Sequence, residues 1–179
     1  MPRAGFAGHD RMITDLVQIR LLGEKKRPEN ERFRRHMKAH DHSDRILRRI
    51  AEEVEEQIDC TQCANCCRVA TAKVSERDVE RLARYLRITP AAFRAGYTTK
   101  SEEEGVILRR TEDTGCVFLE GKECTVYDAR PDSCQRFPHV VRGNGSIASR
   151  MWEFIDRACY CPIVYNALEA FKVETGFRR

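Results

Sequence analysis

The sequence predicts a mainly helical α+β protein with a small cysteine-rich lobe that is held together by metal. Three observations lead to this prediction. Apolar residues recur at helical spacing over much of the chain, short strand-like runs occur only after Gly105, and all nine cysteines lie between Cys60 and Cys161. The expected divisions are a helical arm at 1–58, a metal-binding domain at 59–163 and a C-terminal tail at 164–179.

The arm contains three candidate helices, each marked by apolar residues three or four positions apart. Gly23 with the run Glu24–Pro28 is expected to end the first helix, Asn30 to cap the second, and Ser43 to begin the third. The apolar positions are Ile13, Leu16, Val17 and Leu21, then Phe33 and Met37, then Ile46, Leu47, Ile50, Val54 and Ile58. In the third helix, basic residues precede acidic ones, which opposes the helix dipole, so packing must hold it.

After the first group of cysteines, two further helices are expected. Ser75 and Asp78 have the spacing of a capping box, and Thr89-Pro90 is typical of an N-cap followed by a first-turn proline. The predicted strands are Val106–Leu108, Cys116–Leu119 and Cys124–Tyr127, the last two joined by a turn at Gly121-Lys122.

Composition and patterning narrow the range of functions. The stretch Met1–Asp10 is polar, and no run approaches the ~18 apolar residues of a membrane span. Charged residues make up 34% of the chain but nearly cancel, and the net charge of +4 is too small to predict nucleic-acid binding. We therefore expect a cytoplasmic protein without a membrane partner.

Without a secretory signal, clustered cysteines indicate metal binding or redox work more than disulfides. The most informative segment is Cys60-Thr-Gln-Cys63-Ala-Asn-Cys66-Cys67. Two-residue spacers let successive thiolates converge on a soft cation while backbone N–H groups point at the sulfurs. Four cysteines in eight positions are therefore interpreted as ligands and not as small buried apolar residues.

The adjacent pair Cys66 and Cys67 adds a constraint, because neighbouring side chains diverge on both strands and helices. One resolution assigns Cys60, Cys63 and one member of the pair to one centre, and the other member to a second centre. The competing resolution is a thiolate that bridges two metals. More than one metal centre is therefore expected to be possible.

All nine cysteines are candidate metal ligands, and they could supply two four-ligand centres with one to spare or a multinuclear zinc cluster. Iron and zinc both accept four sulfurs, so spacing does not decide between an iron–sulfur cluster such as [4Fe–4S] and zinc. Arg68, Arg130 and Arg136 are predicted to neutralise and hydrogen-bond the site. The remaining candidate ligands are Cys116, Cys124, Cys134, Cys159 and Cys161.

At these residues the chain resembles the CxxCxxCC family, described as zinc- or iron-chelating cysteine-cluster proteins. The resemblance covers roughly residues 59–163. It rests on Cys60–Arg68, Cys116–Leu119, Cys124–Tyr127, Arg130–Cys134 with Arg136–Pro138, and Cys161-Pro162. It implies a metal-chelating or iron–sulfur domain, and some relatives resemble part of flagellin lysine N-methylases.

The sequence departs from the family pattern at two places. Gln135 follows Cys134 where the family usually has Arg, and Cys159 lies outside the pattern, so we expect Cys159 to be the spare thiol. Methyl transfer ranks third among the functional hypotheses, because the chain is short and shows no cofactor-binding signature. The first is an iron–sulfur protein for electron transfer, redox sensing or support of an oxidoreductase, and the second is a zinc-stapled module whose helical arm binds a protein partner.

Histidines give a weaker indication of metal binding. His36 and His40 are four residues apart and His42 follows, so one helix face could present imidazoles to a metal. A solvated helix face is the favoured interpretation of these residues. His139 is expected near Cys134 because it lies only five residues further along the chain.

Overall fold

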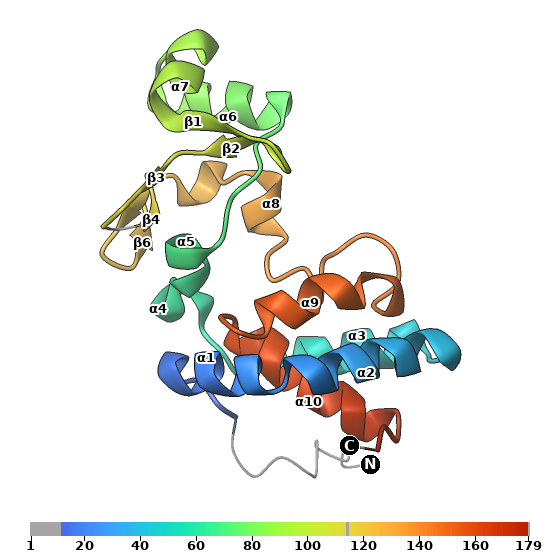
Figure 1. Cartoon of the computed structure of the whole chain (residues 1–179). Coiled ribbons are helices and arrows are strands. Elements are labelled where there is room, and N and C mark those ends of the chain that lie inside the picture. Colours follow the sequence, from blue (N-terminus) through green and yellow to red (C-terminus); the bar gives the residue numbers. More distant parts are fainter. Residues whose placement is uncertain (1–11, 114, 179) are drawn as a thin grey trace, which may run out of the picture. The chain divides into compact units, whose positions relative to one another are not determined.

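The computed structural model describes residues 12–113 and 115–178 (Figure 1). The chain divides into two compact units: Met1–Ile58 with Gly143–Arg179, and Asp59–Arg142. The polar stretch Met1–Asp10 lies outside the described residues, and the predicted ranges 1–58, 59–163 and 164–179 stay a prediction. No helix within 12–113 and 115–178 has the combination of length and apolar character needed to cross a membrane.

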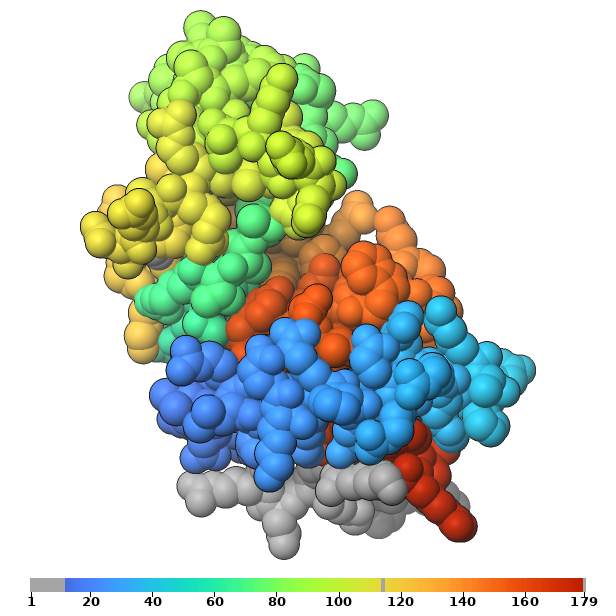
Figure 2. All heavy atoms as spheres, viewed as in Figure 1, coloured from blue at the N-terminus to red at the C-terminus, as the bar shows by residue number. Residues whose placement is uncertain are grey.

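The first unit is helical in its described residues, and its helices pack around α10. Because α10 is apolar on almost every side, it is buried along nearly its whole length, as expected of a central helix. It packs against α3, while α2 packs against α9. The elements are α1 (Leu16–Lys25), α2 (Arg27–Ala39), α3 (Asp44–Glu55), the 3-10 turn η2 (Ala148–Arg150), α9 (Met151–Arg157) and α10 (Pro162–Glu174). Figure 2 shows α1 and α2, in blue, covering one face of this unit.

One helix boundary predicted in this region is wrong, and another is confirmed in part, since α1 ends within the run Glu24–Pro28 but not at Gly23. Helix α1 continues through Gly23 to Lys25, because Gly23 is buried in a close contact with another segment of the unit. A Cβ atom there would lie 2.6 Å from Cys159 Cα, so the glycine serves packing and not helix termination. Helix α2 begins at Arg27, and Asn30 is a buried position inside it instead of its cap.

A buried charge network joins α10 to the first two helices. Lys172 is only 2% exposed and donates to Glu169 at 2.7 Å and to Glu29 at 2.6 Å. Lys26 also contacts Glu169. Burial raises the pKa of Glu169, but the hydrogen bonds from Lys172 and Lys26 outweigh burial and leave the pKa lowered. The two lysines therefore hold this carboxylate ionised within the helical core.

In its described residues, the second unit combines short helices with three two-stranded antiparallel sheets, in which β1 pairs with β2, β3 with β4 and β5 with β6. Its helices are α4 (Cys60–Cys63), α5 (Asn65–Val69), α6 (Glu76–Leu86), α7 (Pro90–Tyr97), the 3-10 turn η1 (Tyr127–Ala129) and α8 (Asp132–Gln135). Its strands are β1 (Thr98–Ser101), β2 (Gly105–Leu108), β3 (Arg110–Thr111), β4 (Gly115–Cys116), β5 (Leu119–Glu120) and β6 (Glu123–Cys124). The predicted mainly helical α+β class is confirmed.

The helix caps and the hairpin turn predicted for the second unit are confirmed. Ser75 and Asp78 form the capping box of α6, and Thr89 caps α7 through its side chain. The turn between β5 and β6 lies at Gly121-Lys122, since Glu120 pairs with Glu123. The predicted strand Cys116–Leu119 is wrong in extent, because it is divided between β4 and β5.

Candidate metal centre

The first four cysteines lie on two very short helices separated by a left-handed residue. Cys60 and Cys63 begin and end α4, and Cys66 and Cys67 lie on α5. Ala64 has φ 49°, a conformation that costs a residue with a Cβ about 1–2 kcal/mol. Ala64 therefore separates α4 from α5, and the two helices can take different directions. As a result, Cys67 can point away from Cys60 and Cys63. Strain of this kind is often found at functional sites.

Four cysteines of the second unit lie near enough for their thiolate charges to act on one another: Cys67, Cys116, Cys124 and Cys134. Burial raises the pKa of the last three, and the charge of Cys67 raises each of them further. The combined effect brings the pKa of Cys134 to about 12, with Cys116 the largest charged contributor. A cation that binds thiolates would offset the raised pKa of Cys116, Cys124 and Cys134.

Cys67 differs from the other three because it ionises easily. A hydrogen bond from the Cys66 side chain lowers the pKa of Cys67 to about 7, and three arginine charges act in the same direction. These are Arg68, Arg130 and Arg110. A thiolate is the form that binds metal, and Cys67 has the largest thiolate fraction of these four cysteines at neutral pH. We therefore expect Cys67 to bind the metal first.

Backbone N–H groups point at two of the sulfurs. Phe118 N–H donates to the sulfur of Cys116, and Val126 N–H donates to that of Cys124, two residues further along the chain in both cases. Phe118 and Val126 are themselves buried in the core of this unit. Core packing therefore fixes the direction of the N–H groups, and such hydrogen bonds stabilise metal-bound thiolates.

Gly115 allows α5 and β4 to approach closely enough to bring Cys67 near Cys116. It has φ +87°, and a Cβ atom at this position would lie 2.6 Å from Cys67 O and 2.7 Å from Arg68 Cα. Both contacts are to backbone, which cannot rotate away as a flexible side chain would. Glycine is therefore required here by conformation and by space.

Gly115→Ala is expected to lower stability by about 2–4 kcal/mol and to reduce the metal bound per chain, since β4 must move away from α5. The matched control is Gly121→Ala, which has φ +60° but no atom within 4 Å of the added Cβ. The control should show only the backbone cost of about 1–2 kcal/mol. Urea unfolding and metal analysis of both variants check this, and equal metal retention would contradict it.

Arginine side chains surround the cysteine group. Arg68 donates to Cys63 O at 3.1 Å and to Gly121 O at 2.6 Å, joining α4 to the β5–β6 turn. Arg130 stacks on the Tyr127 ring at 3.5 Å, and its buried Nε has no hydrogen-bond partner among the described residues. Because Arg130 also lowers the pKa of Cys67 and Cys124, its charge lies close to the sulfurs.

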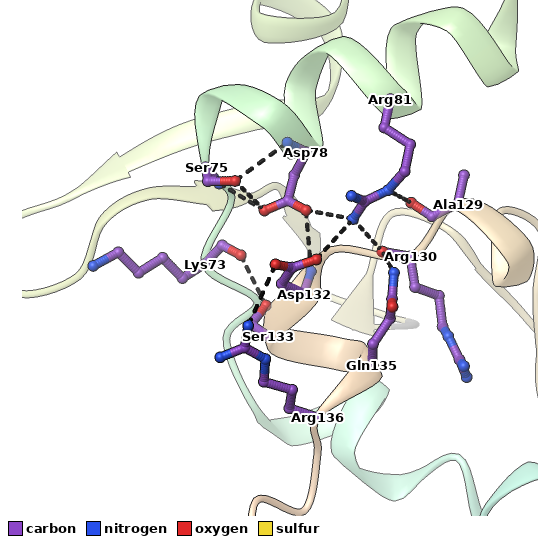
Figure 3. A network of polar contacts seen from close by, with 10 residues as sticks. All are labelled: Lys73, Ser75, Asp78, Arg81, Ala129, Arg130, Asp132, Ser133, Gln135 and Arg136. Atoms are coloured by element: carbon purple, nitrogen blue, oxygen red, sulfur yellow. Dashed lines mark hydrogen bonds and ion pairs between the residues drawn. The ribbon is translucent and has the colours of Figure 1, made fainter. Parts of the chain in front are cut away.

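Cys134 lies on α8, and a polar network fixes this helix against α6 (Figure 3). Asp78 is 2% exposed and accepts from Ser75 Oγ at 2.6 Å and from Asp132 N at 3.1 Å. Arg81 contacts Asp78 and donates to Arg130 O at 2.7 Å. Arg136 belongs to the edge of this network, 3.7 Å from Asp132, rather than to the arginines that act on Cys67.

A sequence model of the CxxCxxCC family, with the description "Putative zinc- or iron-chelating domain", matches residues 59–162. The match covers more than half of the chain, and all nine cysteines lie within it. The chain belongs to the CxxCxxCC family. No solved structure matches this chain.

The CxxCxxCC domain includes the second unit and continues into the first as far as Pro162. Cys159 and Cys161 therefore belong to the family domain but lie in the first unit, where both are buried. Burial raises the pKa of Cys159 to about 11, and the charged groups that act on it are Arg27, Glu24 and Asp156. Its thiol donates to Ile155 O at 3.6 Å.

The sequence did not predict the roles of two residues at or near the candidate metal centre, Arg110 and Asp78. Arg110 contacts the backbone oxygens of Arg68 and Ala70, and its charge acts on Cys67 and Cys116. No cysteine is close to Arg110 in sequence except Cys116, six positions away. Asp78 was recognised only as a helix cap, because its contact with Asp132 spans 54 positions.

Proposed function

We propose that the second unit carries an iron–sulfur cluster and that the protein works in electron transfer, in redox sensing or as an accessory to an oxidoreductase. The observation that carries this proposal is the electrostatic interaction among Cys67, Cys116, Cys124 and Cys134, with three arginine charges acting on Cys67. The C-x2-C-x2-C spacing of Cys60, Cys63 and Cys66 adds further thiols of the type that hold such clusters.

The surroundings fit an anionic metal–thiolate group. An iron–sulfur cluster supplies an electron-transfer couple whose potential depends on net charge, hydrogen bonds to sulfur and burial. Here Phe118 N–H and Val126 N–H donate to ligand sulfurs, while Arg110 and Arg130 provide positive charge. Both features favour the more negative, reduced form of a bound group. They would therefore raise its potential relative to an exposed cluster without them.

Within this proposal, Cys159 is the spare thiol. The charges that act on Cys159 are those of Arg27, Glu24 and Asp156, all residues of the first unit. The proposal also places the protein in a reducing compartment such as the cytoplasm, where the thiols would stay available to metal. Cys60, Cys63 and Cys66 remain candidates for a second centre.

The alternative is a zinc-stapled module that binds a protein partner through its N-terminal helices. One observation favours it: the described residues of the second unit form short helices and two-stranded sheets, and two-stranded sheets are marginally stable without a staple. Helix α1 exposes Val17 and Leu21, at 62% and 61%, and these could contribute an apolar contact surface to a partner.

Anaerobic purification followed by metal and sulfide analysis distinguishes these proposals. An iron–sulfur protein should be brown, absorb near ~400 nm and contain iron with acid-labile sulfide. A zinc module should be colourless, contain stoichiometric zinc and lose its fold in chelator. Absence of both metals at stoichiometric level would contradict the metal-binding function itself.

A further inference from the structure

Three histidines of the first unit converge at the end of α2. His36 lies in the last turn of this helix, and His40 is its C-cap, with φ −126° and ψ 145°. The chain leaves the helix there and brings His42 back beside the other two rings. One ring nitrogen of each histidine lies within 4.8 Å of the other two. Ring centroids are 4.3 Å apart for His36 and His40 and 5.3 Å apart for His36 and His42.

Hydrogen bonds orient two of the rings. His40 Nδ1 lies 3.0 Å from His36 O, and since a carbonyl only accepts, Nδ1 carries the proton and Nε2 the lone pair. By the same argument, His36 Nε2 donates to Thr175 O at 3.3 Å and leaves the lone pair on Nδ1. Backbone carbonyls that hold one imidazole nitrogen are the usual support for a ring whose other nitrogen binds metal.

His42 supplies a second, independent observation. Its Nε2 is buried and has no hydrogen-bond partner among the described residues. Burial and then the charges of His36 and His40 lower the pKa of His42, while Asp41 opposes them. A neutral ring with an unsatisfied buried nitrogen is costly unless a ligand satisfies it. The predicted solvated helix face does not describe this arrangement, in which His36 also stacks edge-on against Phe177 at 5.4 Å.

We propose that His36, His40 and His42 bind one divalent transition-metal ion, for which Zn²⁺ is the probe. Neutral imidazole is a preferred ligand of zinc, copper and nickel, and three histidines leave a fourth position for water or another ligand. Nitrogens bound to one zinc ion at about 2.0–2.1 Å are roughly 3.3 Å apart. The three histidine nitrogens, which lie within 4.8 Å of one another, can therefore reach this spacing by small side-chain rotations. This site lies outside the family match at 59–162 and does not depend on the cysteine centre.

The test uses the full chain without a histidine tag, isolated anaerobically with its cysteine-bound metal. Zn²⁺ is titrated while two-bond ¹H–¹⁵N spectra of the histidine rings and zinc per chain are recorded. Wild type should take up one zinc ion more than the double variant His40→Gln, His42→Gln, and the ring nitrogens of His36, His40 and His42 should shift together. Lys38→Ala, an exposed change on the same helix, should behave as wild type.

The additional ion should disappear in the double variant while its far-ultraviolet circular dichroism and its cysteine-bound metal stay unchanged. Equal zinc uptake by wild type and double variant would overturn the proposal. So would histidine resonances that do not respond to Zn²⁺ in wild type. Because the cysteine-bound metal is measured in the same samples, loss of that metal is distinguished from failure of the histidine site.

Discussion

Cys134→Ser is expected to remove the metal from the cysteine centre. Cys134 is held beside Cys116 and Cys67, and burial raises its pKa to about 12, so its thiol ionises at neutral pH only when a cation compensates. A serine hydroxyl ionises far less readily and is a poor ligand for a soft metal. The loss of affinity should exceed the ~10–100-fold that removal of a surrounding hydrogen-bond partner costs. The loss of affinity is measured as the metal content per chain after anaerobic gel filtration.

Cys159→Ser is the matched control for this experiment. Cys159 is a buried cysteine of the family domain, but its thiol donates to Ile155 O, and a serine hydroxyl can donate in the same way. The control should keep full metal content. If Cys134→Ser retained the metal while Cys159→Ser lost it, the assignment of ligand and spare thiol would have to be reversed.

Asp78→Ala is expected to destabilise the second unit by about 1–3 kcal/mol, because it leaves several partly buried donors without their acceptor. The donors are Ser75 N–H, Asp132 N–H and the guanidinium of Arg81. Arg81 is partly exposed and can be hydrated, which keeps the estimate below that for a fully buried ion pair. Hydrogen exchange should show reduced protection at the start of α6 and in α8, and the metal should bind less tightly, since α8 carries Cys134.

The same substitution has a predictable pH dependence. Burial raises the pKa of Asp78, but hydrogen bonds from Ser75 and Asp132 and the charge of Arg81 outweigh it and hold the pKa below its ordinary 3.8. The ionised carboxylate therefore stabilises the fold above about pH 4, and this contribution is lost as pH falls through the lowered pKa. The difference in unfolding free energy between wild type and Asp78→Ala should shrink below that pH. Glu80→Ala, exposed on the same helix, should change stability little at any pH.

Features that depend on neighbouring residues could be predicted well from the sequence. The capping box at Ser75 and Asp78, the Thr89 cap and the Gly121-Lys122 turn are confirmed, because their hydrogen bonds close within a few residues. The errors arose where distant segments meet. Gly23 looks like a helix end until Ala158 and Cys159 are known to press against it, and Asn30 looks like a cap until its burial is known.

The sequence by itself determined the chemistry of this protein: clustered soft ligands in a family of zinc- or iron-chelating domains. Only the tertiary structure decided which thiols interact. The close contact at Gly115 lets Cys67 approach Cys116, and the buried carboxylate of Asp78 holds α8, which carries Cys134. Neither contact is visible in cysteine spacing. The tertiary structure likewise showed that the three histidines, for which the sequence favoured a solvated helix face, form a partly buried cluster. The physical reason is the same in both cases: side chains far apart in sequence share an environment only after the core has packed, and burial and charge then set their reactivity.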